Sequence, residues 1–220
     1  MSVEMNGSRD IRDLTKDELV NQYRKAQEIN CVGRMLPLAH RLWCLAYPGI
    51  PENFSSNFIK LIEKLERVAE MVHSDKQPDE MQFEVLVDSI YMDCRSMFCE
   101  NDRQAGNYTL QNCLRTAGVT NAATWMDEIF KKQSFTNEKV KSDSFFSWVK
   151  FVTDKSLAHK DPVPTDKQEL LDYRYDFFRD EMNLHEFTFI IFQANEVYVK
   201  AVTHYADIQL LIQEAAQCTE

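Results

Sequence analysis

The stretch "SFFSWVKFVTDKSLAHKD", residues 144–161, decides the fold class of this chain. Its large apolar residues return every three or four positions, which is the spacing of an α-helix that buries one side. These residues are Phe145, Trp148, Val149 and Val152. Ser142 or Ser144 can cap the start of such a helix, and the turn "DPVP" ends it, because proline disfavours helical backbone in the residue before it. We predict an amphipathic helix over 143–159, with its apolar stripe buried and His159 accessible near its end.

The same helical spacing continues through the rest of the chain. It predicts helices over about 57–73, 79–100 and 121–133, and one or two long helices in the C-terminal segment. Thr15 followed by Glu18 is the sequence signature of a capping box, which opens another helix. Glycine and proline number only 5 and 6 among 220 residues, too few to supply the turns of a β-rich protein. The sequence therefore predicts an all-α, multi-helix bundle.

Composition sets limits on where the chain acts and on what it binds. Residues 1–14 read as a flexible polar tail and residues 15–220 as a single helical domain, since no shift in composition marks a boundary. The formal net charge of −10 repels nucleic acid at long range, so any contact with RNA has to be local and basic. No apolar run is long enough to span a membrane, and the N-terminus lacks the apolar region of a signal peptide. We predict a cytoplasmic protein with no membrane partner.

Cysteine usage indicates thiols rather than disulfides or metal sites. The chain has 6 cysteines, and none of them forms a C-x-x-C pair. Most lie within or beside apolar helical patterns, which favours buried free thiols in a reducing cytosol. His40 and Cys44 have the i, i+4 spacing of metal ligands, but no second pair completes a site. The sequence predicts neither a metal nor a cofactor.

Three polar residues near the end of the 143–159 helix carry chemistry that suits RNA cleavage. His159 lies four residues after Lys155, which places both on one side of an α-helix, and a histidine accepts and donates protons near neutral pH. A lysine stabilises charge on a phosphoryl group, and Asp154 can orient an imidazole or a ribose hydroxyl. These parts suit a metal-independent reaction in which a 2′-hydroxyl attacks the adjacent phosphate. A structural role competes with this interpretation, because the helix dipole also favours a histidine in the last turn.

Two segments of the chain resemble one protein family. The stretch "TDKSLAHKD" resembles the signature helix of the HEPN superfamily, in particular its abortive-infection (AbiU-type) branch, whose members carry a stretch of the type R-D-K-x-x-A-H-x-D. The positions that fit are Asp154, Lys155, Ala158, His159 and Asp161. The segment "LVDSIYMDCRSMFCENDRQAGNYTLQNCL", residues 86–114, resembles the same branch's long helix, polar loop and short helix. Together the likeness covers roughly residues 40–200.

The resemblance implies both an architecture and an activity. HEPN proteins are helical bundles, often homodimers, in which the signature helices of two subunits face each other across one composite site. Active members are metal-independent endoribonucleases with the motif R-x4-6-H. The resemblance gives His159 the place of the catalytic histidine and Asp154 that of the polar residue after the arginine. It also implies that the 143–159 helix lies at a two-fold interface, and the large apolar residues of this helix and of segment 187–192 can drive the association.

The chain departs from the family pattern at Thr153, where the motif arginine should stand. Threonine carries no positive charge for a phosphorane. Lys155 is the nearest cation in sequence, but lysine lacks the planar fork that grips two phosphate oxygens. An arginine from the second matching segment can also supply the charge, and the candidates are Arg95, Arg103 and Arg115.

Three interpretations of function remain open at this stage. The first is an endoribonuclease of the host-defence or toxin type, which acts as a homodimer on RNA and is weakened by the missing arginine. The second is a HEPN-like interaction or regulatory module without catalysis. The third is an unrelated helical scaffold protein. An antitoxin or a regulatory protein is an expected further partner of a toxin, but no segment identifies one.

Overall fold

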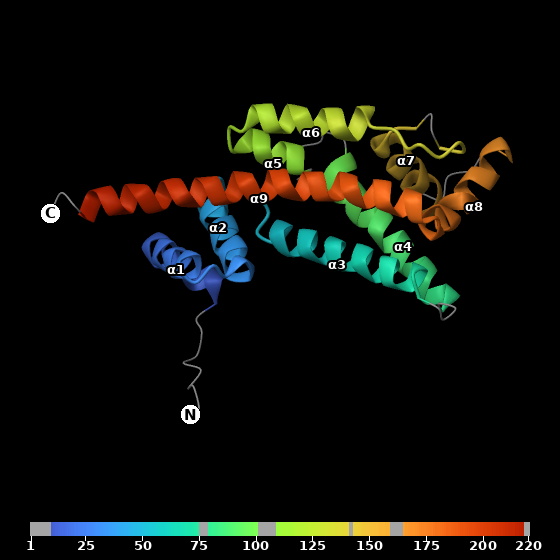
Figure 1. Ribbon diagram of the computed structural model, residues 1–220. Helices are drawn as coiled ribbons and strands as arrows, with labels where there is room; N and C mark the ends of the chain where they lie inside the picture. The colour runs from blue at the N-terminus through green and yellow to red at the C-terminus, as the bar shows by residue number, and fades with distance from the viewer. Residues whose placement is uncertain (1–9, 75–78, 101–108, 141–142, 159–164, 218–220) are drawn as a thin grey trace, which may run out of the picture. The chain divides into compact units, whose positions relative to one another are not determined.

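The structure is helical throughout the part of the chain that it describes (Figure 1). The computed structural model describes residues 10–74, 79–100, 109–140, 143–158 and 165–217. Within these ranges, β-type pairing is limited to one isolated bridge between Ser134 and Ser144. The predicted all-α, multi-helix fold is confirmed. In the same ranges, no helix is long and apolar enough to cross a membrane.

The described helices form two compact units, and the first combines the N-terminal helices with the end of the last one. It spans Met1–Ser55 and Tyr198–Glu220. Its elements are η1 (Ile11–Asp13), α1 (Lys16–Glu28), α2 (Val32–Ala46) and the last part of α9 (Glu181–Gln217). The predicted capping box at the start of α1 is present: the Thr15 hydroxyl accepts from the backbone N–H of Glu18, whose carboxylate accepts from that of Thr15. Asn30 lies between α1 and α2, and its left-handed backbone, with a φ of 50°, interrupts the helical winding there.

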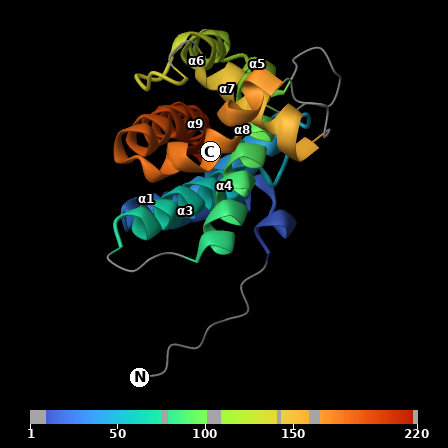
Figure 2. The same cartoon turned by 90° about the vertical axis from the view of Figure 1, so that its right-hand side faces the viewer.

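The second unit spans Ser56–Val197 and so includes Arg95 and Thr153–Ala158. Its elements are α3 (Phe54–Val72), α4 (Glu80–Cys94), η2 (Arg95–Cys99), α5 (Leu110–Thr116), α6 (Thr120–Lys132), α7 (Phe145–Val152), η3 (Thr153–Ala158), α8 (Thr165–Arg179) and the first part of α9. Lys64 of α3 donates to Ser89 and Asp93 of α4 at 2.6 and 2.5 Å, so these two helices lie side by side (Figure 2).

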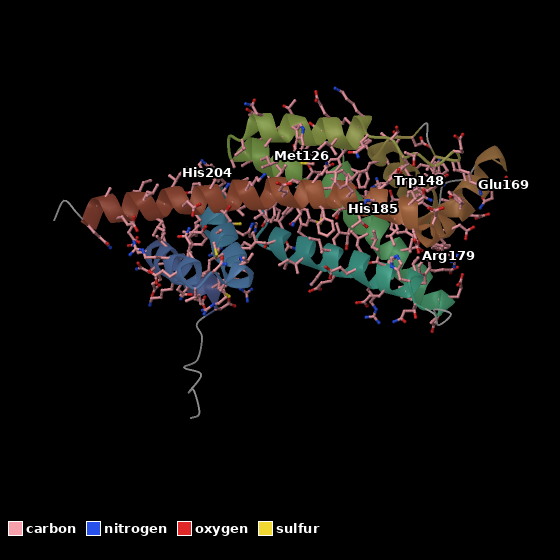
Figure 3. The ribbon with its side chains drawn as sticks, in the orientation of Figure 1. Met126, Trp148, Glu169, Arg179, His185 and His204 are labelled. Atoms are coloured by element: carbon pink, nitrogen blue, oxygen red, sulfur yellow. The ribbon has the colours of Figure 1, made fainter. Side chains whose placement is uncertain are left out.

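Aromatic side chains fill the centre of the second unit. Trp148 of α7 (labelled in Figure 3) and Tyr91 of α4 are fully buried, and the Trp148 indole N–H donates to the Tyr91 hydroxyl at 3.0 Å. Phe187 of α9 packs against five aromatic rings of the unit, namely Tyr91, Phe135, Phe145, Phe177 and Phe178. Val149 and Val152 are buried as well, which confirms the predicted stripe. Burying this much aromatic surface contributes strongly to stability and fixes α7 against α4 and α9.

Some helix boundaries differ from those that the sequence predicts. The helix expected over 57–73 begins earlier, at Phe54, whose backbone N–H bonds to the carbonyl of Pro51. The helix expected over 143–159 begins as predicted, with Ser144 accepting from the backbone N–H of Ser147. Its α-helical part ends at Val152, however, and the chain continues as a π-helix. Apolar spacing over so few residues does not distinguish the two windings.

Candidate functional site

The buried pair Tyr91–Trp148 brings the two family-like segments together. Arg95 follows Tyr91 by one helical turn, and Thr153 follows Trp148 by five residues. Because the two aromatic side chains are hydrogen-bonded and buried, the residues just beyond them meet at the edge of the unit. Arg95 thereby reaches the Thr153 side chain.

Arg95 is anchored by three hydrogen bonds on two of its nitrogens. Its Nε donates to Glu100 at 2.8 Å. Its Nη1 donates to the Thr153 hydroxyl at 2.9 Å and also to the Asp154 carboxylate. The Arg95 side chain is only 12% exposed. These contacts fix the plane of the guanidinium, and bonds between charged partners of this kind are stronger than neutral ones.

The third nitrogen of Arg95 is left open. Within the described residues, Nη2 makes no hydrogen bond, and it is not among the buried polar atoms that lack a partner. Within that part of the chain, no residue takes up the two N–H donors of Nη2. A guanidinium held on one side and open on the other is preorganised to bind an anionic oxygen.

Thr153 cannot supply the positive charge of an arginine, but its side chain binds Arg95. Its side chain is fully buried, and its hydroxyl accepts from Arg95 while lying 2.9 Å from the carbonyl of Val149, to which it donates. An arginine on the 153 position itself would project into this buried space. The cation at Thr153 and Asp154 therefore comes from η2.

Both segments that meet here wind as π-helices. Arg95 opens one of them, η2, and Thr153 opens the other, η3. Single π turns inside α-helices often mark functional sites. The wider winding also changes the predicted register: Lys155 was placed beside His159 on the assumption of an α-helix, which does not hold over Thr153–Ala158.

The three sequence-predicted site residues have different outcomes. Asp154 lies in the site, 27% exposed, and forms an ion pair with Arg95. Lys155 is half-buried in the same π segment. His159 lies outside the described residues.

Of the three arginines considered as substitutes, only Arg95 is found at Thr153 among the described contacts. Arg115 instead donates to Asn112 at 2.8 Å and pairs with Asp127 of α6. Arg103 lies outside the described residues.

A second cluster of chemistry-bearing residues lies in the first unit, at the His40–Cys44 pair. The His40 Nε2 donates to the Pro51 carbonyl at 3.1 Å and lies 3.3 Å from the Cys44 sulfur, while Nδ1 accepts from the Tyr198 hydroxyl at 2.8 Å. All three side chains are buried. Burial lowers the pKa of His40 and raises the pKa of the Cys44 thiol to about 11. This pair is a neutral, structural contact, because a thiol so hard to ionise is a poor nucleophile.

In the described part of the chain, no three histidine, cysteine, aspartate or glutamate side chains gather closely enough to hold a metal ion. Of the cysteines in that part, all five are free thiols, and four of them are buried.

Comparisons with protein-family models, curated proteins and solved structures find no match to this chain.

Two members of the site were not foreseen from the sequence. Glu100 accepts from Arg95 at the end of η2. Its sequence context, apart from its polar side chain, did not indicate a role in the site. Tyr91 did carry one, because it falls on the apolar stripe of the 79–100 helix between Val87 and Cys94, where a hydroxyl needs a buried partner.

Proposed function

We propose that this chain is a HEPN-like, metal-independent endoribonuclease of the host-defence or toxin type, in which Arg95 takes over the role of the motif arginine. The observation that carries the proposal is the open Nη2 of an arginine whose other nitrogens are bound to Glu100, Thr153 and Asp154. A cation held in this way suits a phosphoryl group whose charge grows during the reaction.

In the proposed reaction, the 2′-hydroxyl of the RNA attacks the adjacent phosphorus, and the bond to the 5′-oxygen of the next nucleotide breaks. His159 acts as general acid or base, accepting the proton from the 2′-hydroxyl or donating one to the leaving oxygen. Arg95 binds a non-bridging phosphate oxygen through Nη2. Asp154 positions Arg95, because its carboxylate fixes Nη1 and so the plane of the guanidinium.

Homodimerisation is part of the proposal, and α9 offers apolar surface for it. Phe187 is buried in the unit core, but Phe189 and Phe192 are 49% and 46% exposed, and Met182 lies seven residues before Phe189 on the same side of the helix. Exposed aromatic residues in one stripe are typical of an association surface. Sedimentation of the purified chain at tens of micromolar is expected to give a dimer, and a monomer would contradict the composite-site part of the proposal.

One observation favours the alternative of an inactive HEPN-like interaction or regulatory module. Arg95 faces two carboxylates, Glu100 and Asp154, so its charge is more than balanced within its own cluster. A guanidinium neutralised in this way binds a phosphate less strongly. The two functions are separated by whether the purified chain cleaves RNA.

The test is an RNA-cleavage assay in the presence of excess chelator. The wild type is expected to cleave, and His159→Ala to lower the rate about 10²- to 10⁴-fold, since this is the usual contribution of general acid–base catalysis. His204→Ala, a change at an exposed histidine of α9 (Figure 3), is the matched control and should leave the rate unchanged. Arg95→Ala should lower the rate more than Lys155→Ala. Absence of cleavage by the wild type would support the inactive module.

A further inference from the structure

A basic and aromatic surface lies on α6 and α7, next to the Arg95 site. Phe146 of α7 is half-buried, and two ammonium groups flank its ring: the Nζ atoms of Lys131 from α6 and of Lys150 from α7 each lie 5.9 Å from the ring centroid. This distance is near the outer limit of a cation–π contact. Both lysines are therefore held loosely and can turn toward another anion.

The charge on this surface is opposite to that of the whole chain. Two cations, Lys131 and Lys150, flank Phe146, and Asp127 is a carboxylate that pairs with Lys131. Among the described residues, no carboxylate pairs with Lys150. In a protein of net charge −10, this patch satisfies the requirement that an RNA contact be local and basic.

The surface leads directly to the Arg95 site. Phe146 and Lys150 are one helical turn apart on α7, and Asp154, which holds Arg95, follows four residues after Lys150. From Phe146 to Asp154 the axial distance is about 12 Å at 1.5 Å per residue. Lys150 and Arg95 both lie near the buried Cys99, where each opposes the rise in thiol pKa that burial causes.

We propose that Phe146, flanked by Lys131 and Lys150, is a base-stacking subsite for single-stranded RNA, which leads the strand along α7 toward Arg95. An aromatic ring between cations matches a nucleotide, because the ring stacks on a base while the ammonium groups bind the phosphates on either side. A base in a duplex is already stacked, so the subsite selects unpaired nucleotides. An acidic peptide would use the lysines but not the ring. The subsite rests on the proposed function in one respect only, namely that RNA is the ligand.

Binding is tested separately from cleavage, in the His159→Ala chain, by fluorescence anisotropy with a labelled, unstructured adenine-rich RNA oligonucleotide. Phe146→Ala is expected to weaken binding roughly 5- to 150-fold, the range found for loss of one stacked base. Phe146→Leu keeps an apolar side chain of similar bulk and should weaken binding to a similar extent. Lys150→Gln should lower the slope of log affinity against log salt by about 0.7, the value for one phosphate contact with a single strand.

Matched controls come from the same helix as Lys131. Lys132→Gln changes a lysine that pairs with Glu128, and Trp125→Leu changes an aromatic residue that is 46% exposed on another side of α6. Both variants should bind RNA within about twofold of the parent. Thermal unfolding of each variant checks that the fold is kept, and Phe146→Leu decides the outcome if Phe146→Ala does not fold.

Two results would overturn the subsite. One is a Phe146→Leu chain that binds RNA as the parent does while linear polyphosphate displaces the RNA, which would make the surface a general anion-binding or acidic-partner surface. The other is equal affinity for the oligonucleotide and for its duplex. If the wild type cleaves RNA but Phe146 variants bind normally, the subsite fails and the proposed function stands. If RNA binds through Phe146 but no chain cleaves it, the subsite stands and the proposed function fails.

Discussion

Arg95 and His40 each make three polar contacts through their side chains, but among the described residues one Arg95 nitrogen has no partner, whereas both His40 ring nitrogens have one. Glu100, Thr153 and Asp154 hold Arg95 on two nitrogens and leave Nη2 available. The Tyr198 hydroxyl donates to the Nδ1 of His40. The Pro51 carbonyl and the Cys44 sulfur both contact its Nε2.

The difference shows that residue type alone does not identify a functional site in this chain. A buried histidine next to a cysteine has the composition of a catalytic or metal-binding pair, yet its hydrogen-bonding capacity is fully used inside the protein. The Arg95 cluster has donors on Nη2 that no described residue uses. Unsatisfied capacity beside solvent is what allows chemistry with an outside molecule.

The largest expected effect on stability comes from the side chain that positions the Arg95 cluster. Trp148→Ala should lower the free energy of unfolding by roughly 3–5 kcal/mol, because it opens a cavity in the core and leaves the Tyr91 hydroxyl without its buried partner. Trp125→Ala, at an exposed tryptophan, is the matched control and should change it by less than about 1 kcal/mol. Chemical denaturation measures both, and equal effects would mean that Trp148 does not anchor α7.

A smaller effect on the free energy of unfolding is expected from the cluster of His40, Cys44 and Tyr198. Tyr198→Phe removes the hydroxyl that donates to the His40 Nδ1 and leaves a buried acceptor unpaired, at a cost of about 1–3 kcal/mol. Tyr205→Phe, on the same helix, removes a hydroxyl that makes no hydrogen bond among the described residues, so it should have little effect. RNA cleavage by the folded protein should be unchanged in both. Loss of cleavage in Tyr198→Phe alone would break the distinction between the two clusters.

The smallest expected effect is a pH dependence of stability from His40. Burial lowers the pKa of folded His40 below its ordinary value of 6.5, although Glu52 opposes the shift. The unfolded chain therefore binds this proton first as the pH falls below 6.5, and the free energy of unfolding declines by at most about 1.4 kcal/mol per pH unit from this group. His40→Asn should flatten the profile between pH 6.5 and 5. An unchanged slope would show that His40 is not buried in its neutral form.

Sequence reasoning predicted the fold well because helical spacing is repeated many times along the chain. The site is predictable only in part. Asp154, predicted from the sequence as a site residue, contacts Arg95, which was one of three arginines that the second segment offered. Choosing among the three required the packing of Tyr91 on Trp148, which joins residues 57 positions apart in sequence. The π-helical winding after Val152 has no signature in the spacing, because it is set by contacts between segments.

The central claim is that a guanidinium bound at Thr153 and Asp154 supplies the charge for catalysis, whichever helix it comes from. Thr153→Arg alone overpacks a buried position, so it should destabilise the fold by about 1–3 kcal/mol. The double change Arg95→Thr with Thr153→Arg avoids this by exchanging the two side chains. It moves the arginine to the position that the family pattern gives it.

The most direct measurement compares RNA cleavage by the wild type, by Arg95→Thr and by the exchanged double variant, with folding checked for each. Our account predicts that Arg95→Thr loses about 10²- to 10³-fold in rate, as for the loss of one charge-stabilising donor. The exchanged variant should recover to within about tenfold of the wild type. An Arg95→Thr chain that cleaves RNA at the wild-type rate would contradict the account.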